Sequence, residues 1–119
     1  MALADDQEPH DDAERVKWYL KKAKGGDVDA QYNLAIMYAE GKGTEKDEKE
    51  AARWYAAAAE QGDADAQFSL GVCYHEGKGV GKDDALAIEL WTKAAKQDNQ
   101  DARFVLGWKD GAAEDAAED

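Results

Sequence analysis

The sequence predicts an all-α solenoid of about six helices, and two observations lead to that fold class. First, the segment DVDAQYNLAIMYAEGKG, which begins at Asp27, returns 36 residues later as DADAQFSLGVCYHEGKG at Asp63, and a shorter copy begins at Asn99. Second, the apolar residues of each copy follow the spacing of a helix, and glycines divide the copies into short segments. A fixed period of this length is typical of helical units that stack on one another.

The first expected helix covers residues 11–24. Trp18 and Tyr19 lie 36 residues before Trp54 and Tyr55, which belong to the second helix of the first complete unit. The period therefore assigns residues 11–24 to a second helix that has no first helix before it.

The two complete units each predict a pair of helices. In the first helix of the first unit, Ala30, Leu34 and Tyr38 form a stripe of helical period. Asp27 stands where a helix needs a side chain that accepts its free backbone N–H groups. Gly41 stands where the chain leaves the helix, since glycine takes the left-handed conformation without strain. The expected helices of the two units are 28–40, 47–60, 64–76 and 83–96.

The last expected helix, residues 100–109, has a polar edge. Asp110 occupies the position of Tyr38 and Tyr74 in the earlier units, and Lys109 occupies that of Met37. A charged residue at an aromatic core position is costly unless water solvates it. We therefore expect this helix to act as a cap. The predicted organisation is an acidic flexible tail (1–10), a half repeat (11–26), two full repeats (27–62 and 63–98), a half repeat (99–110) and a second acidic flexible tail (111–119).

The negative charge is concentrated at the two ends. The chain carries 27 acidic and 15 basic residues, a formal net charge of −12. Residues 1–14 and 110–119 hold 11 of the acidic residues and no Lys or Arg, which leaves 16 acidic against 15 basic residues between them. The repeat region is thus nearly neutral and has no basic stripe, so we expect no nucleic-acid partner.

The location is predicted from three features of the sequence. No apolar run approaches the 18 residues of a membrane span, and the N-terminal residues do not follow the pattern of a signal peptide. Cys73 is the single cysteine, so no intrachain disulfide can form. We expect a cytoplasmic protein with no membrane insertion.

The repeated unit resembles the Sel1-like repeat, a relative of the tetratricopeptide repeat. The pattern is A-x-x-x-L-G-x-x-Y-x-x-G-x-G followed by D-x-x-x-A-x-x-W-Y-x-x-A-A-x-x-G. In the second unit it is matched by Ala66, Leu70, Gly71, Tyr74, Gly77, Gly79, Asp83 and Ala87. The resemblance implies a right-handed α-superhelix whose first helices line a concave groove, and an adaptor role. A cysteine-rich subgroup resembles penicillin-binding or β-lactamase proteins, but Cys73 has no partner for that subgroup's disulfides.

The candidate binding residues are the positions of each first helix that avoid the core stripe. They combine apolar and polar side chains, as a groove for a peptide or a helix would. The aromatic residues Tyr32, Phe68 and Phe104 recur at one phase, and we expect them in the core. Trp108 is either an anchor for a partner or a cover for the end of the array. The candidate residues are Asn33, Ile36, Glu40, Ser69, Val72, His75, Glu76, Val105 and Trp108.

The sequence does not support two other kinds of site, a phosphate-binding loop and a Cys–His metal site. The segment GKGVGKD at 77–83 looks like a phosphate-binding loop, but it follows a helix, and Asp83 stands in place of Ser or Thr. Cys73 and His75 lie on different faces of a helix, and no further ligand completes a metal set. No cofactor, metal site or catalytic residue is predicted. Cys73 is expected to pack as a small apolar residue, where the first unit has Met37.

Three functions remain open at this stage. The favoured one is a non-enzymatic module that binds a protein or peptide on the concave face. The alternatives are a penicillin-binding or β-lactamase-like activity and a structural array without a ligand. We expect a monomer; the alternative is end-to-end self-association through apolar edges, which the acidic tails oppose.

Overall fold

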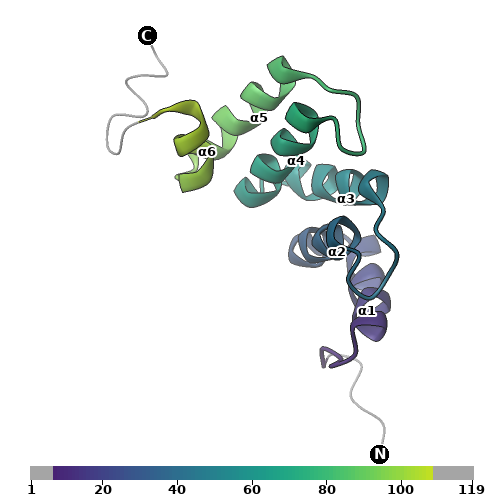
Figure 1. Cartoon of the computed structure of the whole chain (residues 1–119). Coiled ribbons are helices and arrows are strands. Elements are labelled where there is room, and N and C mark those ends of the chain that lie inside the picture. The colour runs from purple at the N-terminus through teal and green to yellow at the C-terminus, as the bar shows by residue number, and fades with distance from the viewer. Residues whose placement is uncertain (1–6, 109–119) are drawn as a thin grey trace, which may run out of the picture.

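The computed structural model describes residues 7–108 of the 119-residue chain. This part is elongated, 60 × 28 × 20 Å, and within it the chain forms six helices and no strand (Figure 1). Each helix contacts mainly the helices before and after it in sequence. The helices are α1 (Asp12–Lys24), α2 (Val28–Glu40), α3 (Glu48–Glu60), α4 (Ala64–Glu76), α5 (Asp84–Lys96) and α6 (Gln100–Leu106).

Two layers of helices follow the bend of the array. Figure 1 shows α2, α4 and α6 along the inner side of the bend and α1, α3 and α5 along the outer side. We call them the inner helices and the outer helices. The first helix of each predicted unit is thus an inner helix, and the second is an outer helix.

The helix starts agree with the sequence to within one residue because each is set by a local cap. In every helix the residue before the start accepts a hydrogen bond from the backbone N–H three residues later, as the Asp63 carboxylate does from Ala66 at 2.9 Å. The inner helices α2 and α4 end at Gly41 and Gly77, both left-handed with φ of +71° and +70°. The six capping residues are Asp11, Asp27, Asp47, Asp63, Asp83 and Asn99.

The last helix is shorter than expected. It was predicted over 100–109, but it ends at Leu106 because Gly107 takes a left-handed conformation with φ of +74°. The equivalent Gly71 lies inside α4 instead, where the chain continues as a helix. The predicted polar edge at Lys109 and Asp110 and the tail 111–119 lie outside the described residues.

The core is built from small side chains on facing helices. Leu34 and Ala35 are completely buried in α2, and Ala58 and Ala94 are completely buried in the outer helices. Larger rings fill the remaining space, and Gly71 leaves room for one of them. A Cβ atom there would lie 2.5 Å from Nε1 of Trp91, which donates to the Phe68 carbonyl oxygen. Close approach between short helices therefore depends on residues with little or no side chain.

The turn within each unit packs against the outer helix of the unit before. A Cβ atom at Gly43 would lie 2.3 Å from the carbonyl oxygen of Asp12, and one at Gly79 would lie 2.1 Å from that of Glu48. Both glycines are left-handed, with φ of +78° and +75°. These two positions are therefore closed to any other residue by backbone contact as well as by conformation.

Buried glutamines connect three successive helices. The Gln67 amide of α4 donates to the Ala59 carbonyl oxygen at the end of α3, and its own oxygen accepts a 3.0 Å hydrogen bond from Gln97 after α5. Gln31 and Gln61 repeat this arrangement one unit earlier, where the Gln31 amide donates to the end of α1. Sequence reasoning missed this role, although the 36-residue spacing of the two buried glutamines was a signal for it.

The third copy of this connection uses a different residue. Arg103 stands in phase with Gln31 and Gln67, and its Nε donates to the Ala95 carbonyl oxygen at 3.1 Å. Its guanidinium also pairs with Asp98, the one non-glycine residue among those described with a positive φ, +70°. Arg103 is thus satisfied by the preceding unit and needs no partner from a later helix.

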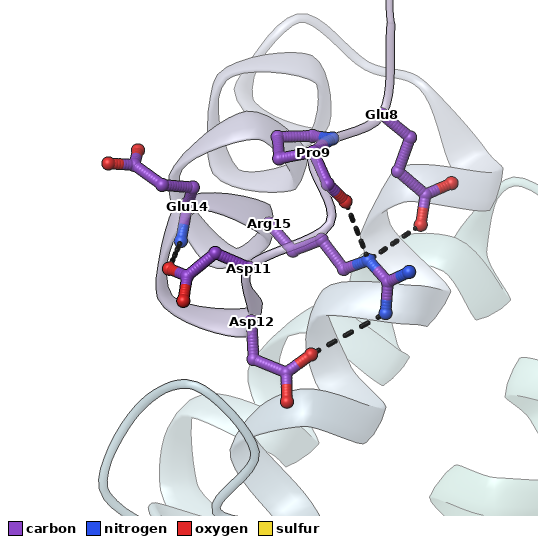
Figure 2. A network of polar contacts seen from close by, with 6 residues as sticks. All are labelled: Glu8, Pro9, Asp11, Asp12, Glu14 and Arg15. Carbon is purple, nitrogen blue, oxygen red and sulfur yellow. Dashed lines mark hydrogen bonds and ion pairs between the residues drawn. The ribbon is translucent and has the colours of Figure 1, made fainter.

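Arg15 of α1 binds the segment that precedes this helix (Figure 2). Nε of Arg15 lies 2.9 Å from the Glu8 carboxylate and donates to the Pro9 carbonyl oxygen at 3.1 Å. The Asp12 carboxylate lies 3.5 Å from the same guanidinium. In the later outer helices the position of Arg15 is taken by Ala51 and Ala87, which are buried in the core. Glu8 and Pro9, which the sequence assigns to a flexible tail, therefore contact α1.

We expect Gly79→Ala to lower the free energy of unfolding by about 2–4 kcal/mol, because it adds a clash and an unfavourable φ. Gly81→Ala is the matched control, since a Cβ atom there has open space around it. Its effect should stay within about 0.5 kcal/mol. Urea unfolding followed by circular dichroism measures both changes. Equal losses in the two variants would contradict the proposed contact with Glu48.

We expect Gln67→Leu to cost about 1–3 kcal/mol, because it removes two hydrogen bonds, one to the Ala59 carbonyl oxygen and one from the Gln97 amide, while keeping the side-chain volume. Gln100→Leu, at an exposed position of α6, is the control and should change stability by less than about 0.5 kcal/mol. Thermal and urea unfolding of the two variants test this. A Gln67→Leu protein as stable as the wild type would rule out the connection as a source of stability.

Candidate functional site

The predicted residues of the first unit gather beside α1. Asn33, Ile36 and Glu40 of α2 line an open cavity of about 150 Å³ together with Tyr19 of α1. Burial raises the pKa of Tyr19. The hydrogen bond with Glu8 and the negative charge of Glu8 raise the pKa of Tyr19 further. This cavity is small and continuous with the surface.

The predicted residues of the second unit do not all point the same way. Ser69 lies beside Tyr32 and Tyr55, where burial raises the pKa of both tyrosines and the Ser69 hydroxyl opposes this rise. Val72 packs against the cluster around Trp91. His75 faces the next outer helix: Nδ1 lies 2.8 Å from the Asp84 carboxylate, and this hydrogen bond lowers the pKa of Asp84.

Glu76 and His75 each have a partner close to them in the sequence. The Glu76 carboxylate lies 3.1 Å from Nζ of Lys78, in the turn after α4. The His75 ring also lies 5.6 Å from the Trp91 ring, measured between centroids. Both residues stay exposed, but they belong to the seam between α4 and α5 more than to the inner side of the array.

At the third unit, one predicted residue is exposed and one covers the core. Val105 of α6 has 45% of its side chain exposed. Trp108 packs against the buried cluster that contains Trp91 and Ala102, so it covers the end of the array. Trp108 also lines an open cavity of about 350 Å³ with Phe104 and Asp101.

The expectation that Phe104 lies in the core is wrong. Tyr32 and Phe68 are half-buried because each meets a ring of the next outer helix: Tyr55 at 5.8 Å and Trp91 at 6.4 Å between centroids. The described part of the chain has no outer helix after α6, and Phe104 is 84% exposed. Burial of Phe104 would require a following outer helix, and the phase of the repeat does not show whether one is present.

The inner helices are acidic, which sequence reasoning did not single out. Asp29, Asp65 and Asp101 recur at one phase near the starts of α2, α4 and α6, and all three are exposed. Neither α2 nor α4 contains Lys or Arg, and Arg103 of α6 is buried and paired. We use the term inner face for the exposed side of these helices that carries Asp29, Asp65, Asp101 and Val105. Phe104 lies beside it, on the edge of α6 where the next outer helix would pack.

The described residues contain neither a group of side chains that could hold a metal ion nor a helix that could span a membrane. Within residues 7–108, no three His, Cys, Asp or Glu side chains are grouped so that they could hold a metal ion. None of the helices in that range is both long and apolar enough to cross a membrane. The segment 77–83 is a turn, with Gly77 and Gly79 both left-handed.

The repeats match a known family. A family model described as Sel1 repeat matches residues 28–63 and 64–99, each one residue later than the units expected from the sequence. The chain belongs to the Sel1 repeat family. Sel1 repeats are commonly protein-interaction modules, and the family is generally non-enzymatic. The predicted family and the all-α repeat solenoid are both confirmed.

Solved structures of other Sel1 repeat proteins are similar. A protective antigen of uropathogenic Escherichia coli with an SLR fold has a TM-score of 0.81 and 44% identity over 83% of this chain, which spans 21% of that chain. A Sel1 repeat protein from Oxalobacter formigenes has a TM-score of 0.78 and 43% identity, covering 82% of this chain and 73% of its own. Comparison with curated proteins gave no match.

A third similar structure is the cysteine-rich protein B of Helicobacter pylori. Its TM-score is 0.73 and its identity 27%, covering 77% of this chain and 69% of its own. The present Sel1 repeats contain one cysteine, Cys73, which is buried in the place that Met37 takes in the first repeat. Its expected role as a small apolar residue is thus confirmed.

We expect the Cys73 thiol to react with iodoacetamide at least about tenfold more slowly in the folded protein than after unfolding, because the thiolate is the reactive form. Burial, with smaller contributions from Glu48 and Glu76, raises the pKa of Cys73. The folded state therefore holds this proton more tightly, so its stabilising effect is complete below about pH 8.5 and declines as the pH rises above it.

The melting temperature measured between pH 7 and pH 9.5 tests the sign of this effect. The wild-type value should fall over that interval by more than that of Cys73→Ala, which lacks the titrating group. An equal fall in the two proteins, or fast alkylation of the folded chain, would contradict the burial of the thiol.

Proposed function

We propose that this Sel1 repeat chain is a non-enzymatic adaptor that binds a protein or peptide on its inner face. The observation that carries the proposal is the exposure of Phe104 and Val105 on α6. Among the described residues these two and Ile88 are the large hydrophobic side chains left exposed, and two of the three lie on an inner helix. Exposed apolar side chains on a rigid scaffold are typical of sites where partners bind.

The residues predicted from the sequence divide into those that contact a partner and those that hold the repeats together. Asn33, Ile36, Glu40 and Ser69 stay as flanking contacts. Val105 becomes the principal contact, because its exposure needs no rearrangement of the core. His75, Glu76, Val72 and Trp108 are assigned to the structure, since each has partners within the repeats.

We also propose that the protein is a monomer in the cytoplasm, with repeat units at 27–62 and 63–98. End-to-end stacking in the register of the repeat would place an inner helix on the N-terminal edge of α1. Arg15 holds that edge with Glu8 and Pro9, where a stacked helix would need a small residue such as Ala51. A reducing compartment suits a chain with a single cysteine.

The enzymatic alternative is not proposed. Penicillin-binding activity is implied only by the resemblance to the cysteine-rich subgroup, and this chain has one cysteine. The structural alternative, an array without a ligand, is separated from the adaptor by the following experiment.

We expect Val105→Ser to reduce capture of the physiological partner about tenfold, because one apolar contact at the centre of a site contributes more than about 1 kcal/mol. The matched control is Ile88→Ser, which removes a similarly exposed β-branched side chain from the outer helix α5. Photo-crosslinkers placed at Ser69 and at Lys93 in separate baits, followed by mass spectrometry, identify the partner and its face.

The outcomes separate the hypotheses. Crosslinks from Ser69 that Val105→Ser weakens and Ile88→Ser spares would support the inner face. Crosslinks mainly from Lys93 would move the site to the outer helices. A chain that forms no specific crosslink from either position would favour a structural array.

A further inference from the structure

We propose that the inner face binds a cationic peptide segment that carries apolar side chains as well as Lys or Arg. This inference rests on the proposed function, since it names the partner of the same surface. It commits to one occupant, a basic stretch of another protein, on the ground of charge complementarity and of the exposed apolar side chains beside the charges.

The first step is the position of the acidic side chains. Asp29, Asp65 and Asp101 stand at the same phase of three inner helices, and all are exposed. Asp65 accepts a 2.9 Å hydrogen bond from the Asn99 side chain, which leaves its second oxygen available. A carboxylate that is already held in place loses little side-chain freedom when it binds a cation.

The second step is that these charges act on one region of the surface. The pKa of Tyr32 is raised chiefly by burial, while a hydrogen bond with Ser69 opposes the rise. The charges of Asp65, Asp63 and Asp101 raise it further. Tyr32 lies on α2, whereas Asp65 and Asp101 lie on α4 and α6. Carboxylates at the start of α4 and on α6 therefore contribute to the potential at one place on α2.

The third step is the contrast with the outer helices. The positive charges of the described helices lie there, apart from the buried Arg103, so the two layers differ in sign as well as position. The inner face is therefore acidic because of its own residues, and not simply because the whole chain has a net negative charge. The outer-helix cations are Arg15, Lys17, Lys21, Lys22, Lys24, Lys49, Arg53, Lys93 and Lys96.

The fourth step is the apolar surface beside the acid. Asp101 and Phe104 line the same open cavity of about 350 Å³, together with Arg103, whose guanidinium is already paired with Asp98. Lysine and arginine suit such a place because their aliphatic stems cover an apolar ring while the charged end reaches a carboxylate. A guanidinium over the face of Phe104 would add a cation–π contact. An acidic peptide would meet repulsion instead.

The experiment uses the full chain and two labelled peptides with identical leucine and phenylalanine positions. One peptide has lysine and the other has glutamate at every remaining charged position. We expect fluorescence polarisation to show at least about tenfold tighter binding of the lysine peptide at low salt, and a smaller difference at about 0.5 M NaCl because salt screens exposed charges.

A matched pair of variants tests the location. Asp65→Asn with Asp101→Asn removes two charges from the inner face and keeps the acceptor for Asn99. Glu60→Gln with Glu89→Gln removes two charges from the exposed surface of the outer helices. Both proteins keep the acidic tails and have the same net charge. We expect the first to bind the lysine peptide about tenfold more weakly and the second to match the wild type within about twofold.

The results overturn the inference in three ways. Equal weakening in both variants would assign the effect to overall charge. Equal binding of the two peptides, with weakening by Val105→Ser, would retain the inner face as a docking site and reject its preference for cations. Failure of both peptides to bind up to about 1 mM, which corresponds to about −4 kcal/mol, would reject the cationic partner. The crosslinking from Ser69 and Lys93 would then decide the proposed function independently.

Discussion

The stack depends on how the buried ends of its short helices satisfy their carbonyl groups. The last carbonyls of a helix have no partner within it, and stacking removes them from water. At the end of α3 the Ala59 carbonyl oxygen accepts from the Gly62 backbone N–H and also from Gln67, which is itself fixed by Gln97 after α5. One side chain therefore connects an outer helix, the next inner helix and the next outer helix. Because the connection recurs at Gln31, it specifies the same register for both units.

This register explains why the repeats can be built from so little side chain. Helices of 13 residues are marginally stable alone, so packing must supply most of their stability. With the register fixed, alanines such as Ala58 and Ala94 are completely buried in their own clusters, and the turn at Gly79 can rest on the backbone of Glu48. The energetic units are therefore the contacts between neighbouring helices, as expected of a solenoid.

The parts of this arrangement that the sequence predicts are the local ones. Caps such as Asp63 and breaks such as Gly77 act within a few residues, so these helix bounds follow from them. The end of α6 does not, because Gly107 has the phase of Gly71, which lies inside a helix. Burial that depends on the next helix does not follow: Phe104 has the phase of Tyr32 and Phe68 but lacks the ring that covers each of them. The buried glutamines were missed for a related reason, because a polar side chain is usually interpreted as surface until its partners are known.

The charge of the inner face is itself a consequence of how the helices begin. An acidic residue in the first turn is favourable because it meets the positive end of the helix dipole. The period places Asp29, Asp65 and Asp101 in that turn of three helices on the same side of the bend, so a preference that acts within each helix produces a shared field across them. The outer helices combine first-turn acids such as Asp12 and Glu48 with many basic residues, so their positive and negative charges partly cancel. A requirement of helix stability thus becomes a property of the surface, and the proposed recognition of a cation needs no residue beyond those that the fold already holds in place.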